Sequence, residues 1–383
     1  MRVWPAACFL LAGVVLAGCS KEVDPDPPAP LPALESELPT RTLWRTRIGV
    51  GTDGQRVMLV PAFDGEKLYL SDREGRVAAV RITDGRRLWQ RETGLAVTGG
   101  VGYRDGQLYV GTLEGEVVAL GAENGETLWR SRVSSEILSP PQGSERGVVV
   151  VQTVDDKVFA LDSRNGEQRW FYQQRAPALT LRGTSTPRVE GEVVYVGFSN
   201  GRLVALSLAD GRLIWESTVA VPKGRTELDR LVDIDASLLR QNGTLYVTSY
   251  QGRLAAVNGE TGVLLWAREL SSYQAVDKSG ERLFVSDARG HLWAVDSNNG
   301  ASIWKQEKLQ ARGVTAPVSY GEYVVVGDYQ GYLHFLSRSD GRLLGRVRVD
   351  DEGLLQPPLL IGNLLYAYGQ GGVLMALRVE EER

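Results

Sequence analysis

Tryptophan recurs at a nearly constant interval along most of this 383-residue chain. The interval is about 43 residues, which is the usual length of one four-stranded blade in a β-propeller. Gly345 occupies the next expected position, inside an otherwise regular copy of the repeat. The interval therefore predicts eight consecutive blades. The repeated tryptophans are Trp44, Trp89, Trp129, Trp170, Trp215, Trp266 and Trp304.

Each repeat consists of short apolar runs separated by turns. In the clearest copy, residues 108–129, the turns are Glu114-Gly115 and Asn124-Gly125. Glycine supplies the positive φ angle that tight hairpins need, so the pattern predicts consecutive antiparallel strands. A further strand precedes each block and often follows a proline, which suits the edge of a sheet because proline lacks a hydrogen-bond donor. These prolines are Pro61, Pro140, Pro187, Pro317 and Pro357.

The two ends of the array complement each other. The last copy ends before a Trp-bearing strand, whereas residues 42–48 carry such a strand before any complete blade. We therefore expect residues 41–383 to form an all-β, eight-bladed propeller of four-stranded antiparallel blades, with the N-terminal strand completing the last blade. Ring closure of this kind removes free sheet edges. The tryptophans should wedge between blades, and Gly345 should leave a weaker wedge.

Residues 1–18 have the pattern of a signal peptide. Arg2 precedes an apolar stretch that is too short to span a bilayer and typical of a secretory segment. The stretch ends in Leu16-Ala-Gly-Cys19, which resembles the bacterial lipobox and implies lipidation of Cys19 and an outer-membrane anchor. The alternative is an ordinary cleavage site followed by an incidental cysteine. Residues 19–40 would then comprise the lipidated cysteine and an extended, Pro-rich tether.

Little else in the sequence indicates chemistry. The net charge is −4 with no basic stripe, which argues against nucleic-acid binding. His291 and His334 occupy nearly corresponding positions in neighbouring repeats, without further ligands at metal-binding spacing. The segments ending at Trp170 and Trp304 resemble the Trp-docking motif of pyrroloquinoline-quinone dehydrogenases, which are also eight-bladed propellers. Many of those enzymes use a disulfide between adjacent cysteines, which this chain lacks, so we expect no catalysis, cofactor or metal.

Besides the 24-residue connection from Trp44 to Leu68, two internal connections between repeats stand out for their length. They run from Trp170 to Val194 and from Trp215 to Leu245, and span 24 and 30 residues. Insertions in repeat proteins often form the binding face. Because these two insertions enter adjacent blades, they can form one continuous surface.

The residue types in the two insertions allow several interpretations. The first contains Leu179, Leu181 and Arg182, and the second contains Asp229, Asp233 and Asp235. Leucines beside an arginine and carboxylates suit an interaction patch with a polar rim. Equally, Leu179 and Leu181 could tuck into the core. A metal site at the three aspartates would lack further oxygen ligands at calcium-loop spacing.

The whole chain resembles the BamB family, the propeller lipoproteins of the outer-membrane β-barrel assembly machinery. The most specific segments are Leu179-Thr-Leu-Arg-Gly183 and Glu227-Leu-Asp-Arg-Leu-Val-Asp-Ile-Asp235. The resemblance implies a non-catalytic scaffold at the periplasmic face of the outer membrane that binds the POTRA domains of BamA and assists folding and insertion of barrel proteins. The contacts that it implies fall on Leu179, Leu181, Arg182, Asp233 and Asp235.

Other modes of action stay open. Exposed blade edges could capture unfolded barrel substrates by adding a strand to a sheet. A lipid-anchored enzyme or ligand-binding propeller would instead use the central channel, as the quinone dehydrogenases do. An envelope adaptor with a different partner is a further alternative.

Overall fold

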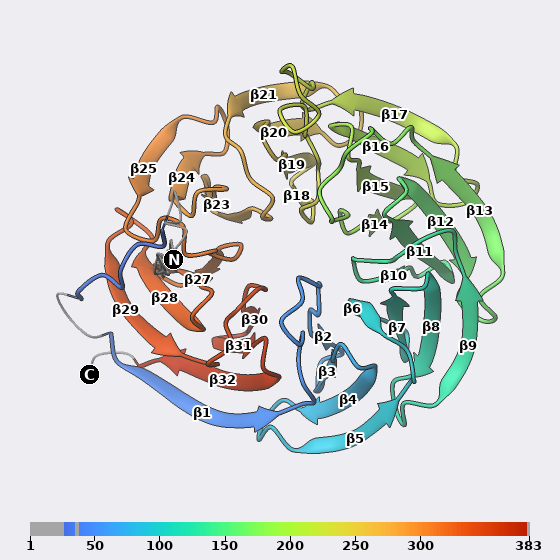
Figure 1. Cartoon of the computed structure of the whole chain (residues 1–383), viewed down its shortest axis with the longest axis horizontal. Helices are drawn as coiled ribbons and strands as arrows, with labels where there is room; N and C mark the ends of the chain where they lie inside the picture. The colour runs from blue at the N-terminus through green and yellow to red at the C-terminus, as the bar shows by residue number, and fades with distance from the viewer. Residues whose placement is uncertain (1–26, 35–37, 381–383) are drawn as a thin grey trace, which may run out of the picture.

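The protein is a closed ring of eight four-stranded antiparallel sheets (Figure 1). The computed structural model describes residues 27–34 and 38–380. In seven of the sheets the chain runs outward strand by strand, so that successive hairpins build one blade, and in the eighth the outermost strand comes from the N-terminal end of the ring. We number the blades in chain order, from blade 1 (residues 62–92, β2–β5) to blade 8 (residues 359–379, β30–β32, with β1 at residues 40–47). The eight-bladed architecture predicted from the repeat is confirmed.

The strands occupy four concentric positions. The innermost are β2 (Ala62–Phe63), β6 (Val97–Arg104), β10 (Gln142–Gly143), β14 (Arg188–Glu190), β18 (Leu239–Gln241), β22 (Asp277–Ser279), β26 (Val318–Tyr320) and β30 (Leu359–Ile361). The second are β3 (Lys67–Ser71), β7 (Gln107–Thr112), β11 (Val148–Thr153), β15 (Val193–Gly197), β19 (Thr244–Thr248), β23 (Arg282–Ser286), β27 (Tyr323–Gly327) and β31 (Leu364–Tyr368). The third are β4 (Arg76–Arg81), β8 (Glu116–Gly121), β12 (Lys157–Asp162), β16 (Arg202–Ser207), β20 (Arg253–Asn258), β24 (Leu292–Asp296), β28 (Tyr332–Ser337) and β32 (Val373–Val379). The outermost are β5 (Arg87–Glu92), β9 (Thr127–Arg132), β13 (Gln168–Gln173), β17 (Leu213–Thr218), β21 (Leu264–Glu269), β25 (Ser302–Gln306), β29 (Leu343–Arg348) and β1 (Thr40–Arg47).

The ring closes between its two ends, as the sequence predicted. Strand β1 pairs antiparallel with β32 from Thr40 opposite Val379 to Arg47 opposite Val373. Beyond this pairing, the Glu380 amide donates to the Pro39 carbonyl at 2.8 Å. The core lies between the sheets, where apolar side chains of the second and third strands of one blade pack on those of the next.

The repeated tryptophans lock neighbouring blades together. Each indole lies on a glycine of the next blade, in the turn that joins the third strand of that blade to its outermost strand. Trp170, for example, lies on Gly211. Its ring N–H donates to a backbone carbonyl of that same blade, as Trp170 Nε1 does to Leu208 at 2.8 Å. Within its own blade, Trp170 stands opposite the small Ala160. The predicted wedge is therefore confirmed as an aromatic contact with a fixed polar end.

Gly345 does not leave an empty wedge. A Cβ added at Gly345 would stand only 2.7 Å from the Cβ of Leu38, so the segment before β1 occupies this position. Opposite Gly345, the usual alanine is replaced by Phe335. The physical reason is that blade 8 is completed by β1 rather than by a hairpin. The segment leading into β1 fills the space that a tryptophan takes elsewhere.

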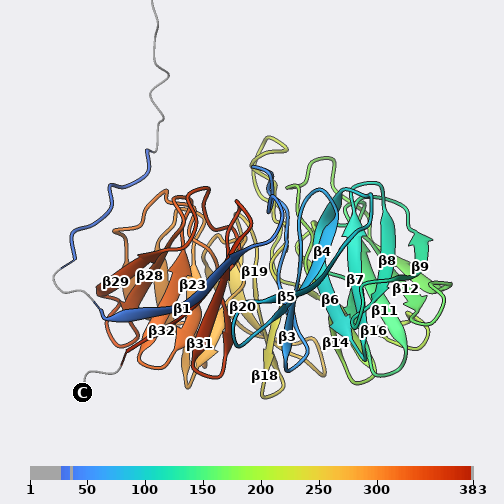
Figure 2. The same ribbon diagram turned by 90° about the horizontal axis from the view of Figure 1, so that it is seen from below.

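The ring has two distinct faces. Because strands alternate in direction, the connections between blades and the turns between second and third strands lie on the same side, which we call the connection face. In Figure 2 this face is uppermost, and the second insertion rises from it. Among the described residues, no helix is long and apolar enough to cross a membrane. The signal-peptide residues and Cys19 lie outside the described part of the chain.

Candidate functional site

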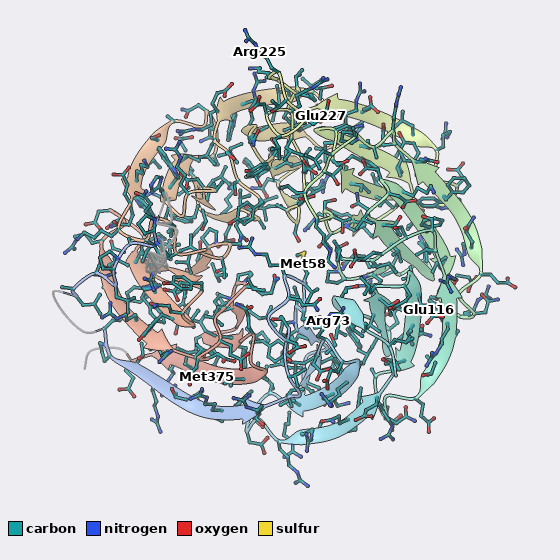
Figure 3. The ribbon with its side chains drawn as sticks, in the orientation of Figure 1. Met58, Arg73, Glu116, Arg225, Glu227 and Met375 are labelled. Atoms are coloured by element: carbon teal, nitrogen blue, oxygen red, sulfur yellow. The ribbon has the colours of Figure 1, made fainter. Side chains whose placement is uncertain are left out.

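The two insertions lie side by side on the connection face and are joined by a hydrogen bond. The first (residues 174–187) connects blades 3 and 4, and the second (residues 219–238) connects blades 4 and 5. The Leu181 amide donates to Asp233 Oδ1 at 2.9 Å. The sequence prediction that the insertions form one surface is thereby confirmed. Arg225 and Glu227 mark the second insertion at the upper edge of the ring in Figure 3.

The two leucines are displayed rather than packed into the core. Leu179 is 40 % exposed, and Leu181 is half-buried. Neither belongs to the clusters of buried apolar side chains described above. The open choice between patch and core is thus resolved toward an exposed apolar patch.

Arg182 extends from the patch toward the preceding connection. Its guanidinium Nη2 donates to Glu136 Oε1, in the segment that joins blades 2 and 3. The arginine side chain is about half exposed. The Glu136 side chain is 14 % exposed, so only the arginine side of the pair is open to a carboxylate of a partner.

The two aspartates lie beneath the leucines. Asp233 is 1 % exposed, and its carboxylate supports the Leu181 backbone instead of facing solvent. Its own backbone carbonyl accepts from the Tyr250 amide at 2.9 Å, which fixes it to blade 5. Asp235 lies under Gly183, where an added Cβ would meet its carboxylate at 2.5 Å. The aspartates therefore shape the loop that presents the leucines.

The carboxylates under the patch influence one another. Burial raises the pKa of Asp233 to about 6. Burial, followed by the charge of Asp233, raises the pKa of Asp235 well above its usual range. Asp156, in the turn between β11 and β12, has a raised pKa for the same first reason and accepts a hydrogen bond from Ser199. The sequence analysis did not include Asp156 among the candidate site residues. Asp156 replaces the glycine that the other repeats have in the turn between the second and third strands, so the departure was visible in the sequence.

Asp229 does not join this group. It lies at the exposed tip of the second insertion, where its Oδ2 accepts from the Thr226 amide at 3.1 Å. Within residues 27–34 and 38–380, no group of three or more His, Cys, Asp or Glu side chains is arranged to hold a metal ion. Both histidines instead pair with a carboxylate: His291 Nδ1 lies 3.0 Å from Asp287 Oδ2, and His334 Nε2 lies 2.9 Å from Asp328 Oδ2.

A hollow of about 540 Å³ lies next to the second insertion, between blades 5 and 6. Trp293 lines it, with Arg268 and Lys305 placed 5.1 and 4.9 Å from the ring centroid. The indole N–H donates to Asp287 Oδ2 at 2.9 Å. The Asp287 carboxylate of this wall is therefore already paired with Trp293 and His291.

Comparison with known proteins connects these features to one family. A family model described as outer membrane protein assembly factor BamB matches residues 40–96 and 73–306. The protein of that name from Pseudomonas aeruginosa is 42% identical over 380 residues, covering 99% of this chain and 100% of the relative. The one from Aliivibrio fischeri is 44% identical over 370 residues, covering 96% of each.

Solved structures show the same fold. The crystal structure of BamB from Moraxella catarrhalis superposes with a TM-score of 0.82 at 28% identity, and covers 88% of this chain and 99% of that one. The quinohemoprotein alcohol dehydrogenase from Comamonas testosteroni has a TM-score of 0.71 at 13% identity, covering 90% of this chain and 77% of that one. The second likeness concerns the propeller architecture alone.

Proposed function

This chain belongs to the BamB family of outer-membrane protein assembly factors, and on that premise we propose that it binds the POTRA domains of BamA through the patch formed by the two insertions. The observation that carries the proposal is the pair of leucines, Leu179 and Leu181, displayed on a loop that a buried carboxylate holds in place. A rigid apolar centre with a charged neighbour is the usual anatomy of an interface hot spot.

The proposed role of each side chain follows from how deeply it is buried. Leu179 and Leu181 supply the apolar contact, and Arg182 exchanges Glu136 for an acidic group of the partner. Charge complementarity of this kind fixes orientation and speeds encounter more than it adds affinity. Asp233 and Asp235 act as positioning residues, because they lie beneath the loop and hold its backbone.

The proposed location follows from the sequence before the ring. Residues 1–18 direct export, Cys19 carries the lipid, and residues 19–40 connect it to the propeller at 41–383. The chain then associates with the outer membrane from the periplasmic side, within reach of the assembly machinery. In this setting it acts as a scaffold without catalysis, in keeping with relatives that are named as assembly factors.

A second contact, with unfolded barrel substrates, is favoured by the outermost strands. These strands are the edges of their sheets. Several carry exposed apolar side chains, including Leu128 at 51 % and Leu265 at 53 % exposure. An exposed edge with apolar side chains can accept an added strand. A photo-crosslinker placed at Leu265 should recover unfolded barrel protein, and recovery of none would remove this contact from the proposal.

The principal test is a titration of residues 20–383 against the purified POTRA domains of the cognate BamA. The variant Leu179→Asp/Leu181→Asp should lose saturable binding, because it places two charges at the centre of an apolar contact. Its melting temperature should stay close to that of the unchanged chain, since neither side chain is in the core. The matched control is Leu113→Asp/Val263→Asp, which adds two charges at exposed apolar side chains outside the insertions.

Two results would contradict the proposal. If the unchanged chain does not bind the POTRA domains, the partner is wrong. If the double variant binds as well as the control, the POTRA domains are the partner but they bind a different surface of the propeller.

A further inference from the structure

Resting on the lipid anchor proposed above, we propose that residues 27–34 and Leu38 are a docked strap, seated on blade 7, that turns the connection face of the propeller toward the membrane. The sequence alone predicted a tether that merely spaces the ring from its lipid. The contacts of this segment show instead that its last part is bound to the ring.

The first contact is the seat at Gly345. Leu38 lies against Gly345 and joins the apolar cluster between blades 7 and 8. Its amide donates to the Leu344 carbonyl at 3.1 Å. A tryptophan at position 345, as in the other blades, would collide with Leu38. The one departure from the tryptophan repeat is thus the place where the N-terminal segment enters the ring.

The strap is also held by hydrogen bonds over its length. The Ala29 amide donates to the Gln310 carbonyl at 2.9 Å. The Ala29 carbonyl accepts from Arg312 Nη1 at 2.8 Å. Further along, the Pro32 carbonyl accepts from Arg346 Nη1 at 2.8 Å. Because proline-rich chain is already extended, little conformational entropy is lost when it docks.

Arg312 is built into the ring as a receptor for the strap. It is 1 % exposed, and its Nε and Nη2 donate to Asp328 Oδ2 at 2.9 and 2.6 Å. His334 Nε2 lies 2.9 Å from the same oxygen. The guanidinium is fixed by these partners, and its remaining terminal nitrogen meets Ala29. With the strap in place the guanidinium is shielded from solvent, and Ala29 accepts from the nitrogen that Asp328 leaves free.

The strap leaves the ring on the connection face. Gln310 and Arg312 lie in the connection between blades 6 and 7, and Asp328 begins the turn between β27 and β28. Both belong to the face that also carries the two insertions. Figure 2 shows the described part of the strap rising beside blade 7 toward this upper face.

Docking shortens the link to the lipid. The ten residues from Ser20 to Ala29 can span at most about 36 Å, whereas the 21 residues from Ser20 to Thr40 could span about 75 Å. A short link that starts on the connection face holds that face nearest to the bilayer. The patch at Leu179 and Leu181 is on the same face, so a partner would meet it in the space between ring and membrane.

Docking of the strap can be measured directly. Cys8 and Cys19 are the only cysteines in the sequence, so residues 20–383 contain none. Spin labels on Ala33→Cys in the strap and Ser339→Cys in blade 7, both exposed positions, should give a narrow distance distribution. Leu38→Asp and, independently, Gly345→Trp should broaden it. Pro30→Asp adds the same charge to the strap at an exposed position and should leave it narrow.

A broad distribution in the unchanged chain would overturn the proposal. A narrow one in both Leu38→Asp and Gly345→Trp would also overturn it, because the seat would then have no role.

Orientation is tested with the mature lipidated chain on vesicles of phosphatidylethanolamine and phosphatidylglycerol that contain an acceptor dye in the headgroups. A donor on Glu227→Cys, on the connection face, should lose more fluorescence to the lipid than a donor on Glu123→Cys, on the opposite face. Leu38→Asp should reduce the difference between the two positions. No BamA is present, so this result is independent of partner binding.

Equal transfer from both positions on membrane-bound protein would refute the orientation while leaving the anchor intact. Failure of the chain to attach to vesicles would refute the anchor, and the orientation with it.

Discussion

Glycine and tryptophan act as a pair in this protein. Each repeated indole needs a neighbour without a side chain, and the glycine of the next blade's turn supplies both that space and the left-handed backbone that the turn requires. Gly211 illustrates both requirements, with a φ of +71° and the Trp170 ring 2.6 Å from where a Cβ would stand. The sequence repeat therefore records two residues in contact across a blade boundary.

Substitution of Gly211 separates the two requirements. Gly243→Ala, at a φ of +77° with open space around it, should lower the free energy of unfolding by about 1 kcal/mol, the usual cost of a left-handed non-glycine residue. Gly211→Ala should add an overpacking cost of about 1–3 kcal/mol. Chemical denaturation of both variants measures the two free energies of unfolding. Equal decreases would mean that the Trp170 indole shifts to accommodate the added methyl group without an energetic cost.

Asp233 gives the patch a dependence on pH. Its folded-state pKa of about 6 lies above the usual value, so the folded state holds a proton that the unfolded state releases. The free energy of unfolding should therefore fall as pH rises from about 4 to about 6, and then level off. The contribution of this residue is on the order of 2–3 kcal/mol.

Asp233→Asn removes the proton exchange and keeps an oxygen to accept from the Leu181 amide. Denaturation at several pH values should show a shallower slope between pH 4 and 6 than in the unchanged chain, with Asp156 and Asp235 supplying what remains. POTRA binding near pH 7 should survive Asp233→Asn and weaken in Asp233→Ala. An unchanged slope in Asp233→Asn would show that Asp233 does not titrate in this range.

At the level of elements, the segment before the first blade has two parts with different structural roles. Strand β1 closes the ring by pairing along β32, and the strap before it docks on blade 7 through Leu38, Ala29 and Pro32. The first supplies the outermost strand of a blade, whereas the second contributes a few surface contacts. Their removal should have unequal effects.

A chain that begins at residue 38 keeps Leu38 and β1, and should fold into the same ring with a melting temperature a few degrees lower. A chain that begins at residue 48 lacks β1 and leaves β32 as an unpaired edge next to an unfilled space. That chain should aggregate or unfold at much lower temperature. Circular dichroism and size-exclusion chromatography distinguish these outcomes, and a monomeric, stable ring without β1 would contradict the closure argument.

The whole molecule is a ring in which each blade contacts only its two neighbours. Seven of the eight interfaces share the tryptophan–glycine contact, and Leu38 fills the corresponding place between blades 7 and 8, so no blade is physically privileged as the first. The observed ends meet at Pro39 and Glu380. The position of the natural chain ends in the ring matters for the strap and its lipid rather than for the propeller.

Circular permutation tests this view. A chain that joins Glu380 to Pro39 through a short flexible linker, with new ends in the Asn242-Gly243 hairpin of blade 5, should form the same propeller and still bind the POTRA domains. Exposed hairpin tips usually tolerate such cuts. Failure to fold would show that closure by the natural termini guides folding.

The sequence by itself determined the repeat, the number of blades, the wedge role of the tryptophans, the closing strand and the two insertions. These features follow from local period and turn chemistry, which are visible along one chain. Only the tertiary structure decided that Leu179 and Leu181 are displayed, that Asp233 is buried beneath them and that Leu38 fills the place at Gly345. Burial depends on which distant segments meet, and Leu38 and Gly345 are brought together only when the ring closes.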